Sequence, residues 1–364
     1  MGKREILLIA AFLVVGVVAW RLTAPPPAPG QEGFSLARAW RSVRTAVQSD
    51  AARATATRGE RVRVEATVNR VVVAEFRGEL SVVGADGAEL AAELTATLSG
   101  PDDAEAQRLA QEVRLQLEPD GGDLRVRVIL PDVRRPPDLS LRLRVPRRLL
   151  VRLSVQARRL EVREVAGLEL DVRRGSVTVT GVAGALLGEQ RDGELEVSEV
   201  GSARLVLRRV DARLARIDGT AVIEATDGDL TVRETGRLEL QARRVDVEVE
   251  RVRGEAQVAG TDGQVDMREA GGRLRFEGRR CPLQLNPVPE AGADVSSEGA
   301  RVELRLPPSG ATLDLVASGG EIRVPEGTLR VDRREEVSRA TGAVGTGGPS
   351  VRVRTTSGDI IVRR

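Results

Sequence analysis

A short pattern of apolar and small residues recurs through the middle of this 364-residue chain and constrains the fold more than any other feature. The pattern is apolar-x-apolar-x-x-apolar-x-small, and it starts at residues 160, 177, 195, 212, 230, 247 and 265. The step in residue number from one start to the next alternates between 17 and 18. A short, constant period is typical of folds in which each unit stacks on its neighbours.

Each unit contains two stretches in which apolar and polar residues alternate, the second typified by residues 168–172, 203–207 and 238–242. Alternation with period two indicates strands. The intervening turns carry Gly or Asp-Gly, which suits corners that need a positive φ. A unit this short cannot bury its own apolar face, so neighbours must stack. We therefore predict an all-β fold, a β-solenoid with one unit of 17–18 residues per rung.

Charged residues at the fifth motif position support this rung length. The residues there are Glu164, Gly181, Glu199, Arg216, Glu234, Arg251 and Glu269. If rungs stack at about 4.8 Å, the charges alternate in sign from Glu199 onward. A rung of twice this length would instead place Glu on Glu, which is repulsive.

A second series of charged residues lies ten residues further into each unit. We call its five arginines the arginine ladder: Arg174, Arg191, Arg209, Arg244 and Arg279. These side chains are the candidate interaction surface, because a basic stripe attracts anionic envelope polymers or lipid head groups. The alternative is a solvated face neutralised by salt bridges.

The sequence divides into five regions. We expect a membrane anchor or signal segment over residues 1–24, and a Pro-rich spacer with a short amphipathic helix over residues 25–59. A β-rich entry region follows over residues 60–150, with one helix from Asp102 to Val113 and a turn at residues 119–122. The regular solenoid covers residues 151–280, and irregular rungs cover residues 281–364. Within these regions we expect a linker over residues 49–60 and a loop over residues 332–349.

An apolar run from Ile6 to Trp20 follows Lys3 and Arg4. Its 15 residues span about 22 Å as a helix, and snorkelling of the flanking arginines completes a membrane span. A cleaved signal peptide and a buried core helix are the alternatives. The basic N-terminus favours an orientation with the bulk of the chain outside the cytoplasm. After the spacer, Leu36, Trp40, Val43 and Val47 have the spacing of an amphipathic helix.

The composition argues against an enzyme. The chain has no His, and its single cysteine, Cys281, excludes an internal disulfide and a cysteine-based zinc site. We therefore expect no cofactor and no metal. The net charge of +2 and the aromatic content of 2% give no indication of nucleic-acid binding.

Several aspartates near one line of turns are the candidates for other chemistry: Asp192, Asp227, Asp229, Asp262 and Asp266. Asp-Gly at a corner is mainly turn chemistry. Calcium binding and catalysis on uronic-acid polymers are the alternatives.

Residues 60–364 resemble the bacterial putative-adhesin family of β-strand repeats. The resemblance rests on the seven motif units, on the Pro-ended strand Leu141–Pro146, and on the Ser-Gly-Gly-Glu-Ile and Ser-Gly-Asp-Ile segments that end at Ile322 and Ile360. It implies a β-repeat fold, often anchored in a membrane and in some members tied to envelope stress, with no catalytic residues to carry over.

These features together predict a non-enzymatic, single-pass protein of the bacterial plasma membrane. Its solenoid would present a rigid surface for adhesion or for binding a protein or envelope polymer. One alternative is an envelope-stress sensor or a scaffold that self-associates through uncapped terminal rungs. The other is a carbohydrate-active enzyme.

Overall fold

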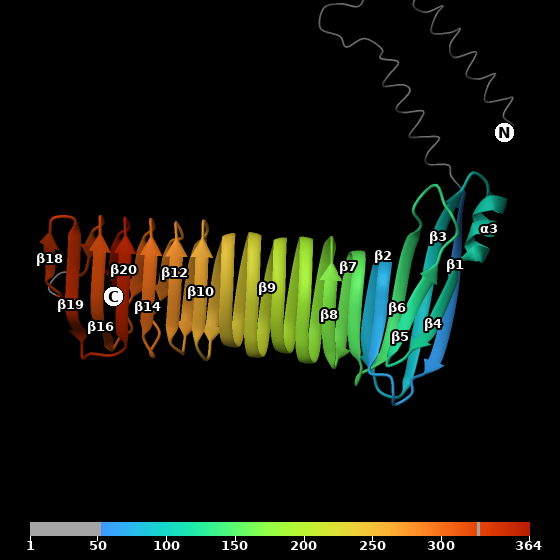
Figure 1. Ribbon diagram of the computed structural model, residues 1–364, viewed down its shortest axis with the longest axis horizontal. Helices are drawn as coiled ribbons and strands as arrows, with labels where there is room; N and C mark the ends of the chain where they lie inside the picture. Colours follow the sequence, from blue (N-terminus) through green and yellow to red (C-terminus); the bar gives the residue numbers. More distant parts are fainter. Residues whose placement is uncertain (1–51, 326–327) are drawn as a thin grey trace, which may run out of the picture. The chain divides into compact units, whose positions relative to one another are not determined.

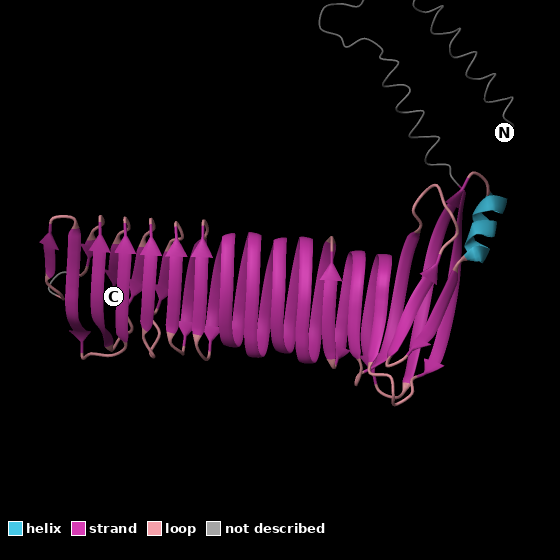
Figure 2. Cartoon of the chain, viewed as in Figure 1, coloured by secondary structure: helices cyan, strands magenta, loops and turns pink. Residues whose placement is uncertain are grey.

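The computed structural model describes residues 52–325 and 328–364, and about three quarters of them lie in β-strands (Figures 1 and 2). The single helix in this part of the chain is α3 (Asp103–Glu112), so the predicted all-β class is confirmed. Within the described residues no helix is both long and apolar enough to cross a membrane. The predicted anchor over residues 1–24 and the amphipathic helix before residue 50 lie outside the described residues.

Parallel strands, paired at the period of the sequence pattern, form most of the structure. Leu160 pairs with Val177, and Leu168 pairs with Leu186, so partners follow the step of the repeat. The strands involved are β7 (Leu150–Val165), β8 (Gly167–Val172) and β9 (Gly175–Val252). β9 is unusually long because its 78 residues pass through several corners without losing strand hydrogen bonds.

The same pairing continues beyond β9, where β12 lies next to β10 (Figure 1). In the same way β13 pairs with β11. These strands are β10 (Ala256–Thr261), β11 (Gln264–Ala270), β12 (Leu274–Arg279), β13 (Leu283–Asn286), β14 (Ala293–Glu298) and β15 (Val302–Arg305). They fall into two series. The first series contains β8, β10, β12 and β14, and the second contains β11, β13 and β15. One strand of each makes a rung.

Inward side chains of the two series form one continuous core of Leu, Val, Ala and Ile. Phe276, 1% exposed, is the largest fully buried side chain in the described part of the chain. Gly278 makes room for it, because a Cβ there would lie 2.5 Å from Phe276 Cε1. Gly260 likewise faces Cys281, whose Sγ would be 2.7 Å from an added Cβ. These two glycines therefore leave the space that the neighbouring Phe276 and Cys281 side chains fill in a close-packed core.

At the N-terminal end the stack begins with β2 (Arg70–Ala85), which pairs in parallel with β7 along most of its length. Its other edge pairs with two strands. The first four residues pair with β5 (Asp123–Ile129), and the last seven pair with β6 (Asp138–Pro146). β2 is therefore the strand at which one sheet divides into two branches.

Each branch continues with antiparallel strands. β4 (Arg114–Asp120) pairs with β5, and β3 (Glu89–Gly100) pairs with β6 and with β1 (Ala52–Arg63). The predicted turn at residues 119–122 is confirmed as the β4–β5 hairpin. The predicted linker over residues 49–60 is wrong from Ala52 onward, because alternate residues of β1 face the core and Ala56 is buried.

The predicted helix is confirmed as α3. The Asp102 carboxylate caps its N-terminus by accepting a hydrogen bond of 2.8 Å from the Glu105 N–H. At the other end, Arg58 of β1 donates to the carbonyl oxygens of Ala110 and Val113, at 3.1 and 3.0 Å. A cation at the helix C-terminus satisfies free carbonyls and complements the helix dipole.

At the C-terminal end the order of strands in space differs from their order in the chain. The strands are β16 (Gly310–Ser318), β17 (Ile322–Arg323), β18 (Val331–Arg334), β19 (Val337–Gly345), β20 (Ser350–Thr356) and β21 (Ile360–Arg363). β20 lies between β14 and β16, since Val353 pairs with both Val295 and Leu315. β21 lies between β15 and β17 in the same way. The last strand pair is therefore inserted between two earlier rungs.

The predicted loop over residues 332–349 is wrong, because this segment contains β19 and most of β18. β19 is antiparallel to β16 and β18 is antiparallel to β19. Alternate residues of β19, including Ala340 and Val344, are buried. β19 thus covers the outer edge of β16, which would otherwise be unpaired.

Candidate interaction surface

Charged residues with left-handed backbone occupy both corners of the stack. The corner after first-series strands, here the first corner, contains Asp192, Arg209, Asp227, Arg244, Asp262 and Arg280, with φ of 48–59°. The second corner, after second-series strands, contains Glu164, Glu199, Arg216, Glu234, Arg251 and Glu269, with φ of 53–59°. The sequence predicts Gly or Asp-Gly at corners with a positive φ, and Gly181, Asp192-Gly193 and Asp227-Gly228 confirm this. The sequence does not predict that Arg and Glu take the left-handed conformation at most of the other corners.

At the first corner, each of three arginines holds the aspartate one rung earlier with two hydrogen bonds. Arg209 Nε and Nη2 donate to Asp192 at 2.6 and 3.2 Å. Arg244 makes the same contacts with Asp227, and Arg280 with Asp262, both at 2.6 and 2.9 Å. The guanidinium groups lower the pKa of all three aspartates by hydrogen bonding to the charged form.

Ion pairs also connect neighbouring rungs at the second corner. Arg216 Nη2 lies 2.9 Å from Glu199 Oε1, and Arg251 Nη2 lies 3.1 Å from Glu234 Oε1. These contacts join residues of opposite charge on neighbouring rungs, which is the alternation that the sequence predicts from Glu199 onward. Such exposed pairs contribute little to stability individually, but they favour one register of stacking over others.

The structure divides the arginine ladder between two adjacent columns. Val172 pairs with Gln190, which places Arg174 beside Asp192 rather than beside Arg191. Arg174, Arg209 and Arg244 belong to the aspartate-containing column of the first corner. Arg191 and Arg279 lie one position earlier along their strands. The sequence spacing does not reveal this offset. Units of 17 and 18 residues alternate, and the extra residue of an 18-residue unit does not always lie before the first corner.

Carboxylates neutralise most of the ladder. Arg191 lies 2.7 Å from Glu189 and Arg279 lies 3.5 Å from Glu298, while Arg209 and Arg244 hold their aspartates. Among the described residues Arg174 has no ion pair, and neither does Arg243, which precedes Arg244. The role of the ladder in binding stays a prediction.

Four of the five candidate carboxylates bind arginines, and at Asp229 the contact is made by the backbone. Asp192, Asp227 and Asp262 bind the arginines of the first corner, and Asp266 lies 2.9 Å from Arg268 on β11. The Asp229 N–H donates to Asp211 Oδ1 at 3.2 Å. Across residues 52–325 and 328–364, no group of three or more acidic or cysteine side chains is arranged to hold a metal ion.

A groove of about 1290 Å³ lies where β2 divides, and no feature of the sequence indicates it. Among the described strands, none pairs with residues 74–78 on the edge of β2 that faces β5 and β6. Apolar groups including Phe76 and Leu139 line the groove beside charged groups including Arg77 and Arg173. It is formed by strands far apart in the chain, from Val72 to Arg173, so no local motif marks it.

No protein-family model matches the chain, and no curated protein matches its sequence. Solved bacterial structures align with most of it. They include a putative adhesin from Parabacteroides merdae (9% identity, 85% of this chain, 97% of that chain, TM-score 0.31). They also include a putative adhesin from Bacteroides fragilis (12% identity, 84% and 96%, TM-score 0.24). A structure described as a putative lipid binding protein from Parabacteroides distasonis aligns with 10% identity (85% and 97%, TM-score 0.28).

Several of these structural neighbours are named putative adhesins, as is the family that the sequence resembles. The identities and TM-scores are too low to carry an argument about what this chain binds.

Proposed function

We propose that this chain is a membrane-anchored β-solenoid protein of the bacterial cell envelope that binds an anionic polymer or a protein partner without catalysing a reaction. Its anchor would be the apolar segment before residue 25, with the solenoid outside the cytoplasm. The binding surface would be the first corner, with Arg174 and Arg243 supplying positive charge that takes part in no direct ion pair among the described residues.

The observation that carries this proposal is the continuity of the parallel register. Parallel pairing runs from Val71 on β2 to Leu313 on β16 in the first series, and from Leu80 on β2 to Ile322 on β17 in the second, by way of the inserted strands. Strands fixed on both edges hold their outward side chains at a regular spacing of about 4.8 Å. Such spacing suits a ligand that itself repeats, such as a polymer, better than a compact small molecule.

The location can be tested with spheroplasts of cells that express the full-length chain. Protease is added outside, and the C-terminal half is detected by immunoblot. Loss or shortening of the membrane-bound band before lysis supports the proposed orientation. Protection until detergent is added would overturn it and would place the solenoid inside the cell.

Binding can be tested with the detergent-solubilised full-length chain and immobilised polygalacturonate, a polymer with one carboxylate per sugar. The double variant Arg174→Glu/Arg243→Glu should bind at least about tenfold more weakly, because four charge units change at the first corner. The matched control is Arg142→Glu/Arg144→Glu, which makes the same charge change at exposed positions on β6.

Equal weakening in both double variants would show a general effect of net charge and would remove the first corner from the proposal. The same incubation reports on the enzyme alternative. Release of shortened polymer, with or without calcium, would contradict a purely binding function.

A further inference from the structure

The inserted strands β20 and β21 interrupt a stack that is otherwise in chain order. Val351 pairs with both Ala293 and Leu313, although it comes well after each of them in the chain. Without the insertion, Leu313 would follow Ala293 directly, at nearly the same step in residue number as Ala293 follows Leu274. The chain length between β14 and β16 is thus suitable for direct stacking, yet a strand lies between them.

Charge favours the insertion. Arg352 lies between two aspartates, 3.9 Å from Asp294 and 3.6 Å from Asp314. Asp294 also lies 2.6 Å from Arg273, so Asp314 is the carboxylate that depends more on Arg352. Direct pairing of β14 with β16 would place Asp294 against Asp314, and like charges on adjacent strands are destabilising. Arg352 replaces one repulsive contact by two attractive ones.

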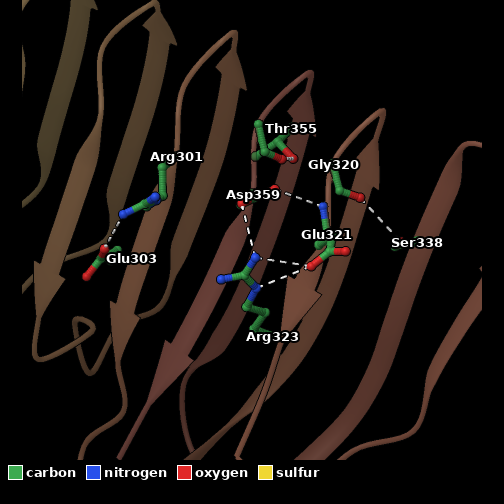
Figure 3. A network of polar contacts seen from close by, with 9 residues as sticks. Arg301, Glu303, Gly320, Glu321, Arg323, Ser338, Thr355 and Asp359 are labelled. Carbon is green, nitrogen blue, oxygen red and sulfur yellow. Dashed lines mark hydrogen bonds and ion pairs between the residues drawn. The ribbon is translucent and has the colours of Figure 1, made fainter.

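The second series fixes the inserted segment in the same way. Arg363 of β21 lies 3.3 Å from Glu303 on β15. Asp359 accepts a hydrogen bond of 3.0 Å from the Glu321 N–H and lies 4.0 Å from Arg323 (Figure 3). The rung beyond the insertion is bonded in turn to β19, where Ser338 donates to the Gly320 carbonyl at 3.3 Å. The inserted segment thus occupies a slot, which we define as the space between strands β14 and β15 on one side and strands β16 and β17 on the other. Side chains on both sides of this slot bind the segment.

A short hinge joins the inserted segment to the strand before it. Residues 346–349, Thr-Gly-Gly-Pro, connect β19 to β20, and the two glycines among these four residues give the hinge wide conformational freedom. Every copy of the chain carries the same slot and the same segment. An identical element joined by a short hinge is the structural requirement for exchange between copies.

We propose that Ser350–Arg363 is an exchangeable rung, which fills the slot of a second copy of this chain as well as its own. Its backbone would complete the edges of β14 and β16 in the partner, as in β-strand addition. The partner's Asp294 and Asp314 would receive Arg352. This association is independent of the polymer binding proposed above.

The test uses two full-length chains with different affinity tags, produced in the same cell. One carries Ser296→Cys and the other Arg354→Cys, because these two residues face each other across β14 and β20. Neighbouring strands are about 4.8 Å apart, within the range that a disulfide spans. The control pair is Gln257→Cys with Arg275→Cys, which are partners on the internal strands β10 and β12. Cys281 is 1% exposed and is common to all four chains.

After oxidation, a cross-linked heterodimer in the first pair and not in the control pair is expected. Equal cross-linking in both pairs, or none in either, would overturn the proposal. A single chain carrying both Ser296→Cys and Arg354→Cys keeps the result interpretable. Its internal disulfide should form in the remaining monomer, and failure to form it would mean that β20 does not occupy the slot at all, which also overturns the proposal.

Discussion

Arg209 and Asp192 form an ion pair with two hydrogen bonds although both have left-handed backbone, with φ of 54° and 59°. A left-handed conformation costs an L-residue about 1–2 kcal/mol. At the first corner this free-energy cost is repeated in successive rungs, at the aspartates and arginines that bind one another. The conformation aims both side chains along the stack, so the strained backbone and the ion pairs occur together.

Stability should depend on pH through the aspartates of the first corner. Their pKa values lie below the ordinary 3.8 in the folded chain. A lowered folded pKa means that the stabilisation is present above the unfolded pKa and is lost as pH falls through the folded one. We expect the Tm to be steady above about pH 5 and to fall below about pH 4.

The triple variant Asp192→Asn/Asp227→Asn/Asp262→Asn isolates this effect, since Asn tolerates left-handed backbone well. Its Tm should be below that of the unchanged chain at pH 7, and the difference should narrow below about pH 4. Asp132→Asn, at an exposed loop position, is the control. A difference that persists unchanged at low pH would contradict the assignment.

Glu234→Val should destabilise the fold because a β-branched side chain is poorly accommodated at φ 58°. We expect a loss of at least about 1–2 kcal/mol in the free energy of unfolding, measured by urea denaturation. Glu239→Val is the matched control, since it makes the same change at an exposed position within a strand. It should change stability by less than about 0.5 kcal/mol. Equal losses in the two variants would show that the backbone conformation is not the cause.

Gly236→Ala should also be destabilising, for a steric reason. An added Cβ would lie 2.4 Å from the Asp218 carbonyl oxygen and 2.5 Å from that of Gly219 in the neighbouring rung. Overpacking of this kind costs about 1–3 kcal/mol. Gly59→Ala, where the nearest oxygen is 4.0 Å away, should be neutral in the same denaturation experiment. A neutral Gly236→Ala would mean that the rungs can separate without cost.

Arg352→Asp should release the C-terminal segment, because three carboxylates would then adjoin. We expect amide hydrogen exchange over residues 350–363 to become at least about tenfold faster, with the internal strands β10 and β12 unchanged. Arg354→Asp makes the same charge change two residues away, beside Ser296 and Val316. It should leave the protection in place. Equal effects of the two substitutions would exclude charge pairing as the reason for the insertion.

The thiol of Cys281 should be unreactive in the folded chain. It is 1% exposed, and burial raises its pKa to about 11. At pH 8 the thiolate is therefore a small minority species that reagents cannot reach. Titration with a disulfide reagent should detect no thiol before denaturant is added and one afterwards. Rapid labelling of the native chain would contradict the buried position.

The regular part of the fold could be predicted because its signal is local. Each motif unit repeats its own alternation, and the step from one unit to the next is also the step between parallel partners such as Leu160 and Val177. Helix α3 is equally visible, since Asp102 is an N-cap residue directly before it. Such features depend on neighbours within a few residues or on strict periodicity.

The remaining features depend on contacts that the sequence does not encode periodically. The predicted arginine ladder is one position out of register at Arg191 and Arg279, because units of two lengths alternate. The strand β19 and the groove beside β2 arise from pairing at irregular separations. The pairing of Val353 with both Val295 and Leu315 leaves no pattern, since each of these segments alone reads as an ordinary strand.

The inserted rung also connects the fold to the direction of protein synthesis. Ser350–Arg363 is made after β16 and β17, but it lies between them and the still earlier strands β14 and β15. The stack therefore cannot be completed until residues 350–363 have left the ribosome. A chain truncated before residue 350 would keep a gap inside its array, with two unpaired strand edges facing each other. The fold thereby distinguishes a chain that contains this segment from one that lacks it by whether the gap is filled.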